Sequence, residues 1–99
     1  MEYRLGTVGF SYHDWSGSFY PRDLRPAGYL AFYSRYFDAV ELDTTFHAVP
    51  QPHLVARWAS SVPDHFRFCA KAPASITHGP RLDEQVAPMQ WFVEVMRGL

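Results

Sequence analysis

The chain has 99 residues, of which 47% are hydrophobic and 19% charged, and its net charge is −1 with histidine neutral. This length fits a single domain spanning residues 1–99, and the near-neutral charge excludes nucleic-acid binding through an extended basic surface. The lone cysteine, Cys69, excludes an intramolecular disulfide and favours a reducing cytoplasm. The sequence has no run of eighteen apolar residues and no recognisable signal peptide, so we expect a soluble, cytoplasmic chain with no membrane partner.

Three short apolar segments alternate with three segments of helical period. The predicted strands and helices are, in chain order, residues 3–9, 26–37, 39–43, 52–62, 66–71 and 83–97. Pro52 suits the first turn of its helix because that position needs no N–H donor, and Pro63 ends the same helix. Strands that alternate with helices form parallel sheets with helical crossovers. The sequence therefore predicts an α/β fold with three parallel strands and three helices.

The same periodicity predicts which side chains are buried. The expected core residues of the helices are Leu30, Tyr33, Phe37, Val55, Trp58, Ala59, Val62, Val86, Met89, Val93 and Met96. Cys69 lies in the middle of a strand without a histidine at nucleophile spacing, so we expect a small buried residue there. Arg35 and Arg57 are expected on solvated helix faces.

The stretch AVELDTTFHAVP places carboxylates within and directly after a buried strand. Side chains alternate across a strand, so Val40 and Leu42 should face the helices while Glu41 and Asp43 face the opposite side. The same alternation puts Lys71 on the polar side of the third strand, where it can approach either carboxylate. Open α/β sheets and α/β barrels bind ligands at the carboxyl ends of their strands. We therefore expect a site at this end of the sheet.

Four segments of the chain resemble one known family. They are GTVGFSYHDWSGSFYP, YFDAVELDTTFHAVP, VARWASSVPDHFRFCAKAP and ITHGPRL. They follow the patterns G-T-[SG]-G-[WF]-S-Y, E-[IL]-[ND]-[ST]-T-F-Y, K-x-P and I-T-H, in the same order and with matching spacings. On these motifs the chain is identified as a member of the domain-of-unknown-function 72 family, also called YecE-like, which has no established activity. The chain has Val8 where Ser is common in the family, Phe10 where Trp is usual, and His47 where Tyr usually follows the Phe.

The resemblance implies a TIM-like barrel, a fold of eight strand–helix units that takes about 250 residues. The 99 residues hold about three such units, so we expect the N-terminal portion of a barrel, truncated relative to the full fold. Three strands leave an exposed strand edge, and self-association through that edge is expected as a result.

Three residues are the candidates for catalysis. Glu41 would be the acid or base, with Lys71 as its electrostatic partner, because burial and mutual charge can tune the pKa values of such a pair. His78, in the loop after the third strand, would be a second proton-transfer group. Each has a plainer interpretation: Glu41 and Lys71 as a structural ion pair, and His78 as a histidine that holds its turn. A Schiff base on Lys71 is a further alternative.

Eight residues are predicted to bind substrate. They are Ser11, Tyr12, Trp15, Asp43, Thr45, Phe46, His47 and Thr77. The aromatic members offer ring faces for a sugar or a base, although they could equally pin their own loop. Glu41, Asp43, His47 and His78 could instead hold a divalent ion. No H-x-x-x-H or H-x-H spacing supports that reading, so no metal and no cofactor is predicted.

The sequence leaves two classes of function open, and whether the protein is an enzyme stays undecided. The first is an enzyme-like barrel mouth that acts by acid–base chemistry on a small polar molecule, sugar-like or phosphorylated. The second is a non-catalytic binding or assembly module in which the charged residues form only a structural network. An inactive truncated chain is a third outcome.

Overall fold

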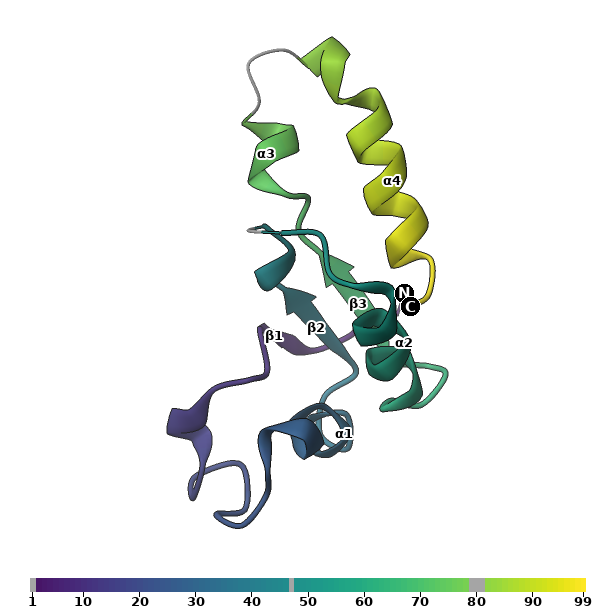
Figure 1. Ribbon diagram of the computed structural model, residues 1–99. Coiled ribbons are helices and arrows are strands. Elements are labelled where there is room, and N and C mark those ends of the chain that lie inside the picture. The colour runs from purple at the N-terminus through teal and green to yellow at the C-terminus, as the bar shows by residue number, and fades with distance from the viewer. Residues whose placement is uncertain (1, 47, 79–81) are drawn as a thin grey trace.

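The computed structural model describes residues 2–46, 48–78 and 82–99, with three strands in one sheet (Figure 1). Strands β1 (Gly6–Val8), β2 (Ala39–Leu42) and β3 (Arg67–Ala70) are parallel and lie in that order. The register places Val8 opposite Glu41 and Glu41 opposite Cys69. The predicted α/β fold with three parallel strands is confirmed, although each strand is shorter than the sequence indicated.

Helical segments follow every strand. They comprise the 3-10 helices η1 (His13–Trp15), η2 (Pro26–Gly28), η3 (Thr44–Phe46) and η4 (Leu82–Gln85), and the α-helices α1 (Tyr29–Tyr33), α2 (Pro52–Ser60), α3 (Ala74–Thr77) and α4 (Val86–Met96). The helix predicted over 26–37 is split, because η2 opens it and i→i−3 bonds mix with i→i−4 bonds after Tyr33. The helix predicted over 83–97 begins as η4. The helix α3 was not predicted, since four residues are too few to show a period.

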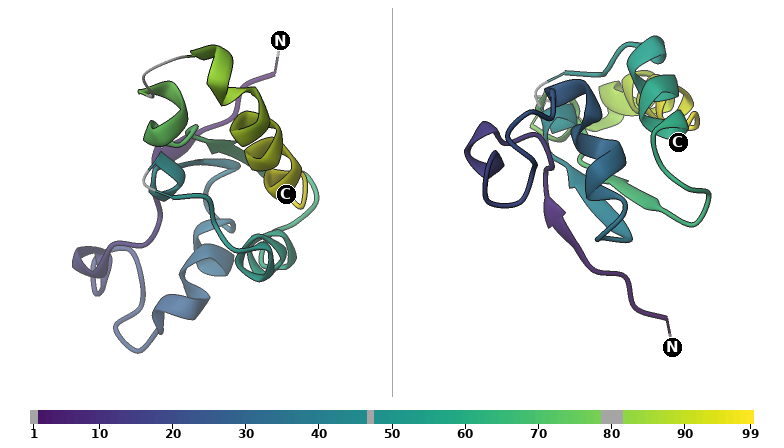
Figure 2. Two further views of the ribbon diagram at one scale, coloured as in Figure 1. Left: turned by 45° about the horizontal axis from the view of Figure 1, so that its top comes forward. Right: turned by 90° about the horizontal axis from the view of Figure 1, so that it is seen from below.

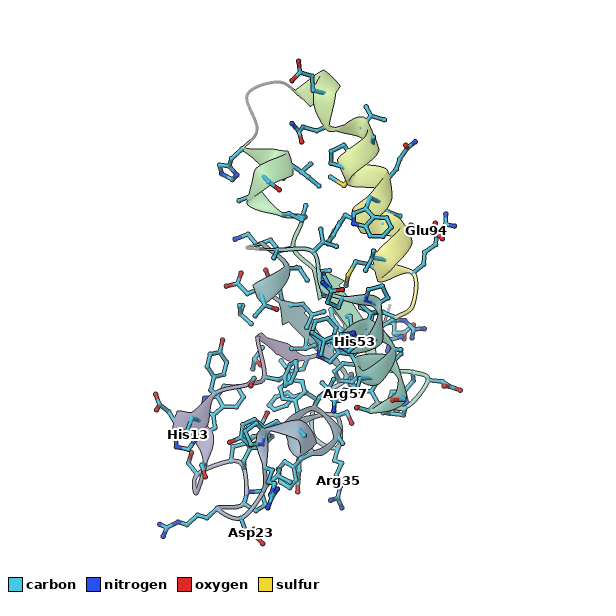
Figure 3. The ribbon with its side chains drawn as sticks, viewed as in Figure 1. His13, Asp23, Arg35, His53, Arg57 and Glu94 are labelled. Carbon is cyan, nitrogen blue, oxygen red and sulfur yellow. The ribbon has the colours of Figure 1, made fainter. Side chains whose placement is uncertain are left out.

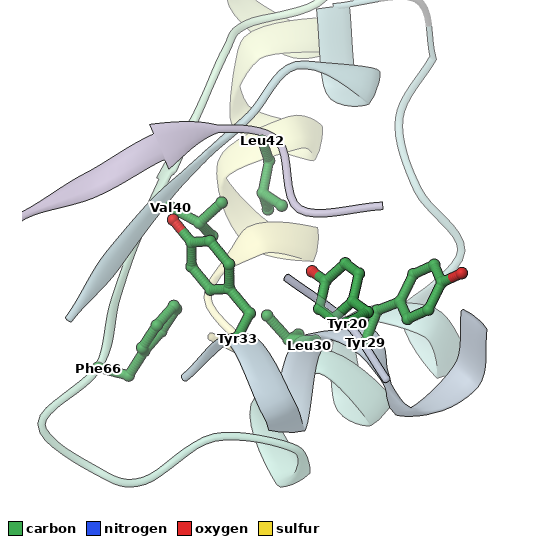
Figure 4. Packing of buried hydrophobic residues seen from close by; sticks show 7 residues of the cluster. All are labelled: Tyr20, Tyr29, Leu30, Tyr33, Val40, Leu42 and Phe66. Carbon is green, nitrogen blue, oxygen red and sulfur yellow. The ribbon is translucent and has the colours of Figure 1, made fainter. Parts of the chain in front are cut away.

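The helices α1, α2 and α4 lie on one side of the sheet (Figure 2). The core forms between that side and the helices. Its buried members are Tyr20, Tyr29, Leu30, Tyr33, Val40, Leu42 and Phe66. Figure 4 shows Val40 and Leu42 of β2 pointing toward Leu30 and Tyr33 of α1. The predicted alternation along β2 is therefore confirmed: the apolar side chains meet the helices, and Glu41 is exposed.

Tyr33 links α1 to two strands. Its side chain is 0% exposed, and its hydroxyl accepts a hydrogen bond from the Thr7 N–H at 2.8 Å and donates one to the Ala39 carbonyl at 2.9 Å. The Thr7 hydroxyl lies 2.9 Å from the same oxygen. Burying a phenol costs free energy unless its hydroxyl is bonded. The Tyr33 side chain therefore fills the core, and its hydroxyl also holds the amino ends of β1 and β2 against α1.

Three residues predicted to be buried are exposed. Val86 and Val93 of α4 are exposed, whereas Phe92 and Val95 are buried. The sequence VAPMQWFVEVM is apolar around nearly the whole helix, so its pattern does not specify which face packs. Cys69 is exposed as well, because it lies on the side of the sheet that no described helix covers. Within the described residues, no helix is long and apolar enough to cross a membrane.

Candidate functional site

The loop after β1 is shaped by Gly9. This residue has φ +78°, and a Cβ on it would lie 2.5 Å from the Tyr12 hydroxyl. Its N–H donates to the Glu41 carbonyl at 2.8 Å, which ties the end of β1 to β2. The Tyr12 hydroxyl donates back to the Val8 carbonyl, and its ring lies 4.7 Å from that of Trp15. A side chain at position 9 would be strained and would displace Tyr12, so glycine sets where the tyrosine stands.

The ends of β2 and β3 bring two predicted site residues together. Lys71 Nζ lies 3.8 Å from Asp43 Oδ1, and each side chain is about half exposed. The Lys71 N–H also donates to the Leu42 carbonyl at 3.2 Å. The expectation that Lys71 approaches Glu41 or Asp43 is confirmed for Asp43. The pair stands at the carboxyl edge of the sheet, where its charges remain accessible to a solute.

Thr45 holds these strand ends in place. It is 1% exposed, and its hydroxyl lies 3.0 Å from the Leu42 carbonyl and 2.6 Å from the Lys71 carbonyl. A hydroxyl has one proton to donate, so the two carbonyls share it. Its predicted contact with substrate stays a prediction. In this structure the hydroxyl links the backbone of Lys71 to the end of β2. It therefore fixes the position of the Lys71 backbone, from which the side chain extends.

Glu41 stands apart from that pair. It is exposed, next to Val8 and Cys69 in register on the side of the sheet away from the helices. No described residue donates a hydrogen bond to its carboxylate or forms an ion pair with it, so Lys71 is not its partner here. Its proposed role as an acid or base therefore rests on its position at the strand end.

His78 ends α3 and faces outward. Its N–H donates to the Ala74 carbonyl at 2.8 Å, and its Nδ1 lies 2.8 Å from the Thr77 hydroxyl. Both side chains are exposed. The contact with the Thr77 hydroxyl helps to orient the imidazole. The residue thus sits in the loop after β3, as predicted, on a helix that was not predicted.

Two predicted site residues cannot be placed. His47 lies outside the described residues, and so does the side chain of Phe46. Among the residues that are described, no three His, Cys, Asp or Glu side chains gather into a group that could hold a metal ion. The alternative metal site at residues 41, 43, 47 and 78 therefore finds no support in the described residues.

A cleft of about 540 Å³ opens between the carboxyl ends of β1 and β2 and the helices α1 and α2. Ser11, Tyr12 and Asp43, all predicted to bind substrate, line it. Trp15 does not line it and instead packs against Phe19, with ring centroids 5.8 Å apart. The predicted binding residues that can be placed are therefore divided between this cleft, the strand ends, the aromatic core and α3, which carries Thr77.

Among the lining residues that were not predicted to be functional, Arg57 and Trp58 have the side chains most suited to binding. Arg57 and Trp58 are neighbours on α2, and Figure 3 labels Arg57 on the part of that helix nearest α1. Arg57 was predicted to be a solvated residue and Trp58 a core residue. Arg57 is exposed and Trp58 is partly buried, so both descriptions hold, yet both residues also border the cleft. A cation followed directly by an indole on the same helix was the signal that could have indicated this.

Comparisons with known proteins point to one family. A family model described as "Protein of unknown function DUF72" matches residues 4–99. The curated relative "UPF0759 protein YecE" of Escherichia coli K12 is 50% identical over 49 residues, and "UPF0759 protein YunF" of Bacillus subtilis is 33% identical over 73 residues. Among solved structures, a DUF72 family protein from Thermotoga maritima superposes with TM-score 0.71 at 30% identity. Another, from Enterococcus faecalis, does so with TM-score 0.65 at 27% identity.

These relatives are all much longer than the chain. The match to YecE covers 50% of this chain and 18% of that protein, and the match to YunF covers 74% and 25%. The structural matches cover 90% of this chain and 37% of the Thermotoga protein, and 94% and 32% of the Enterococcus protein. The chain therefore spans less than two fifths of each of them.

Proposed function

Because the chain belongs to the DUF72 family, a TIM-barrel-like family of unknown function, we propose that the carboxyl edge of its sheet forms part of a barrel mouth. This mouth acts on a small polar molecule, sugar-like or phosphorylated. The observation that carries the proposal is the Asp43–Lys71 pair, 3.8 Å apart and about half exposed at that edge. TIM barrels place their active sites at the carboxyl ends of the strands.

In this proposal each charged residue has a separate task. Lys71 holds an anionic or hydroxyl oxygen of the substrate, since its ammonium carries three donors on a flexible stem. Asp43 orients that ammonium and accepts a substrate hydroxyl. Glu41, exposed on the same strand, is the acid or base, and His78 at the end of α3 is the second proton-transfer group. The backbone clamp made by Thr45 supports the arrangement because it fixes the strand ends that carry the pair.

The binding part of the proposal is tested with glucose 6-phosphate as the probe. Amide NMR spectra of residues 1–99 are recorded during the titration, and we expect shifts concentrated at the strand ends around residues 43 and 71. Lys71→Met should weaken binding by about tenfold, the value of one charge-assisted hydrogen bond. The matched control is Arg97→Gln, which breaks the exposed Glu94–Arg97 pair of 3.3 Å on α4 and should leave binding unchanged.

The catalytic part is followed on the same samples by phosphorus NMR over time. Glu41→Gln should keep binding and abolish any conversion of the probe. Binding without conversion in the unaltered chain would favour the non-catalytic binding module. Absence of binding, or equal binding by Lys71→Met, would overturn the proposed site.

A further inference from the structure

The cleft between α1 and α2 is built entirely from one part of the chain. Its lining residues all fall between Gly9 and Ser61. It lies on the helix side of the sheet, where Leu30 and Leu42 border it, and Glu41 and Lys71 are not among its lining residues. At about 540 Å³ it has the size of a pocket for a small molecule, for which volumes of roughly 300–1,000 Å³ are typical.

The walls of this cleft are mostly apolar. Leu54 and Trp58 of α2 stand on one side, and Pro26 and Ala27 of η2 stand on the other. Leu30 and Leu42 belong to the buried core, which makes the base of the cleft firm. An apolar body such as a ring or a short hydrocarbon chain would lose its hydration shell there, which favours binding.

The charges at the cleft do not cancel. Asp43 contributes a carboxylate, but Lys71 lies 3.8 Å from it and offsets its charge. The guanidinium of Arg57 forms no hydrogen bond or ion pair with any described residue. A guanidinium presents five donors in a planar fork that matches a carboxylate or phosphate. The cleft therefore offers an unpaired cation beside an apolar wall.

We propose that this cleft binds a small molecule with an apolar body and one anionic group. Arg57 holds the anion, and Trp58 and Leu54 pack against the body. The site is distinct from the proposed barrel mouth: it adjoins that mouth at Asp43, but neither Lys71 nor Glu41 lines it. It also gives α2 a role beyond covering the sheet.

Two probes with the same body test the proposal. Hydrocinnamate carries a carboxylate on a phenylalkyl body, and hydrocinnamyl alcohol carries a hydroxyl in its place. Binding to residues 1–99 is followed by isothermal titration and by the amide NMR shifts of α2. We expect hydrocinnamate to bind about tenfold more tightly than the alcohol, since hydrogen bonds to charged groups are stronger than those between neutral groups. In Arg57→Gln the acid and the alcohol should bind with similar affinity. In Arg57→Lys the acid should still bind more tightly than the alcohol, but by a smaller factor.

The controls separate this site from bulk charge and from the barrel mouth. Arg35→Gln removes an exposed arginine that does not line the cleft, and it should leave the preference for the acid intact. Lys71→Met should impair the binding of glucose 6-phosphate and lower the preference for the acid only in part, because it leaves the Asp43 carboxylate at the cleft without its neighbouring cation. Arg57→Gln should abolish that preference and leave the binding of glucose 6-phosphate unchanged, so the two proposals fail independently. Equal affinity for the acid and the alcohol would overturn the inference, as would no binding of either probe. The inference would also be overturned if Arg57→Gln kept the preference for the acid over the alcohol, or if Arg35→Gln lost it.

Discussion

The two faces of the β1–β2–β3 sheet differ in what covers them. On the helix side Val40 is 1% exposed, and Tyr33, Leu30 and Phe66 pack around it. On the other side Val8 is 51% exposed, next to Glu41 and Cys69, and no described helix covers the row (Figure 2). In a TIM barrel the corresponding face is the packed interior. The helix side therefore supplies the stability of these residues, while the open side carries groups available for contact or chemistry.

The largest contrast between the faces should come from shortening one apolar side chain on each. Phe66→Ala should lower the free energy of unfolding by about 3–5 kcal/mol, because Phe66 is buried and its ring lies 6.1 Å from that of Tyr33. Val8→Ala on the open face should change it by less than about 0.5 kcal/mol. Urea denaturation followed by circular dichroism measures both.

Phe66→Leu replaces Phe66→Ala in this comparison if the latter does not fold. Its loss in the free energy of unfolding should lie between those of Val8→Ala and Phe66→Ala. Equal losses for Val8→Ala and Phe66→Leu would show that the exposed face is covered in solution. Self-association through the strand edge, which stays a prediction, would be one way to cover it.

A single hydroxyl sharpens the comparison within the core. Tyr33→Phe keeps the ring but removes the acceptor of the Thr7 N–H and the donor to the Ala39 carbonyl, at 2.8 and 2.9 Å. We expect a loss of about 1–3 kcal/mol, the cost of leaving partly buried polar groups without a partner. Tyr36→Phe is the control, because Tyr36 is 61% exposed and should lose less than about 0.5 kcal/mol. If Tyr33→Phe loses no more stability than Tyr36→Phe, a water molecule replaces the Tyr33 hydroxyl in the variant.

The sequence predicted best where local periodicity decides the outcome. Alternation along β2 assigned Val40 and Glu41 to opposite faces, and the same rule in β3 brought Lys71 to the side of Asp43. These predictions required only two rules: side chains alternate across a strand, and neighbouring parallel strands turn their polar side chains to the same face of the sheet. The approach of Lys71 to Asp43 at the strand ends could therefore be predicted without coordinates.

The sequence predicted least where packing between distant segments decides the outcome. In α4 apolar residues surround the helix, so the choice of Phe92 and not Val93 for the core comes from its contacts with other elements. Cys69 looked like a core residue, yet its face has no cover among the described residues. Arg57 gained its place beside a cleft because η2 and α1 approach α2, which no local pattern encodes.

The smallest expected effect concerns the pH dependence of the helix side. Burial raises the pKa of the Tyr20 phenol far above its usual 10.0, and the neighbouring Tyr33 and Tyr29 add to the shift. The hydroxyl donates to the Phe10 carbonyl, which also favours the protonated form, and the ring stacks on Tyr29 with centroids 4.1 Å apart. Protonated Tyr20 therefore belongs to the folded state.

The sign of the effect follows from that shift. Below pH 10 Tyr20 is protonated in both the folded and unfolded chains, so its contribution to stability is fully present. As the pH rises above 10 the unfolded chain releases this proton first, and the free energy of unfolding falls. Tyr20→Phe should lose stability at neutral pH but show a weaker fall between pH 9 and pH 11, roughly one unit either side of that usual pKa. Tyr36→Phe, altered at an exposed position, should keep the fall of the unaltered chain. If the free energy of unfolding of Tyr20→Phe fell with rising pH as steeply as that of the unaltered chain, other groups would cause the fall. Burial of Tyr20 would then not explain why the helix side is sensitive to base.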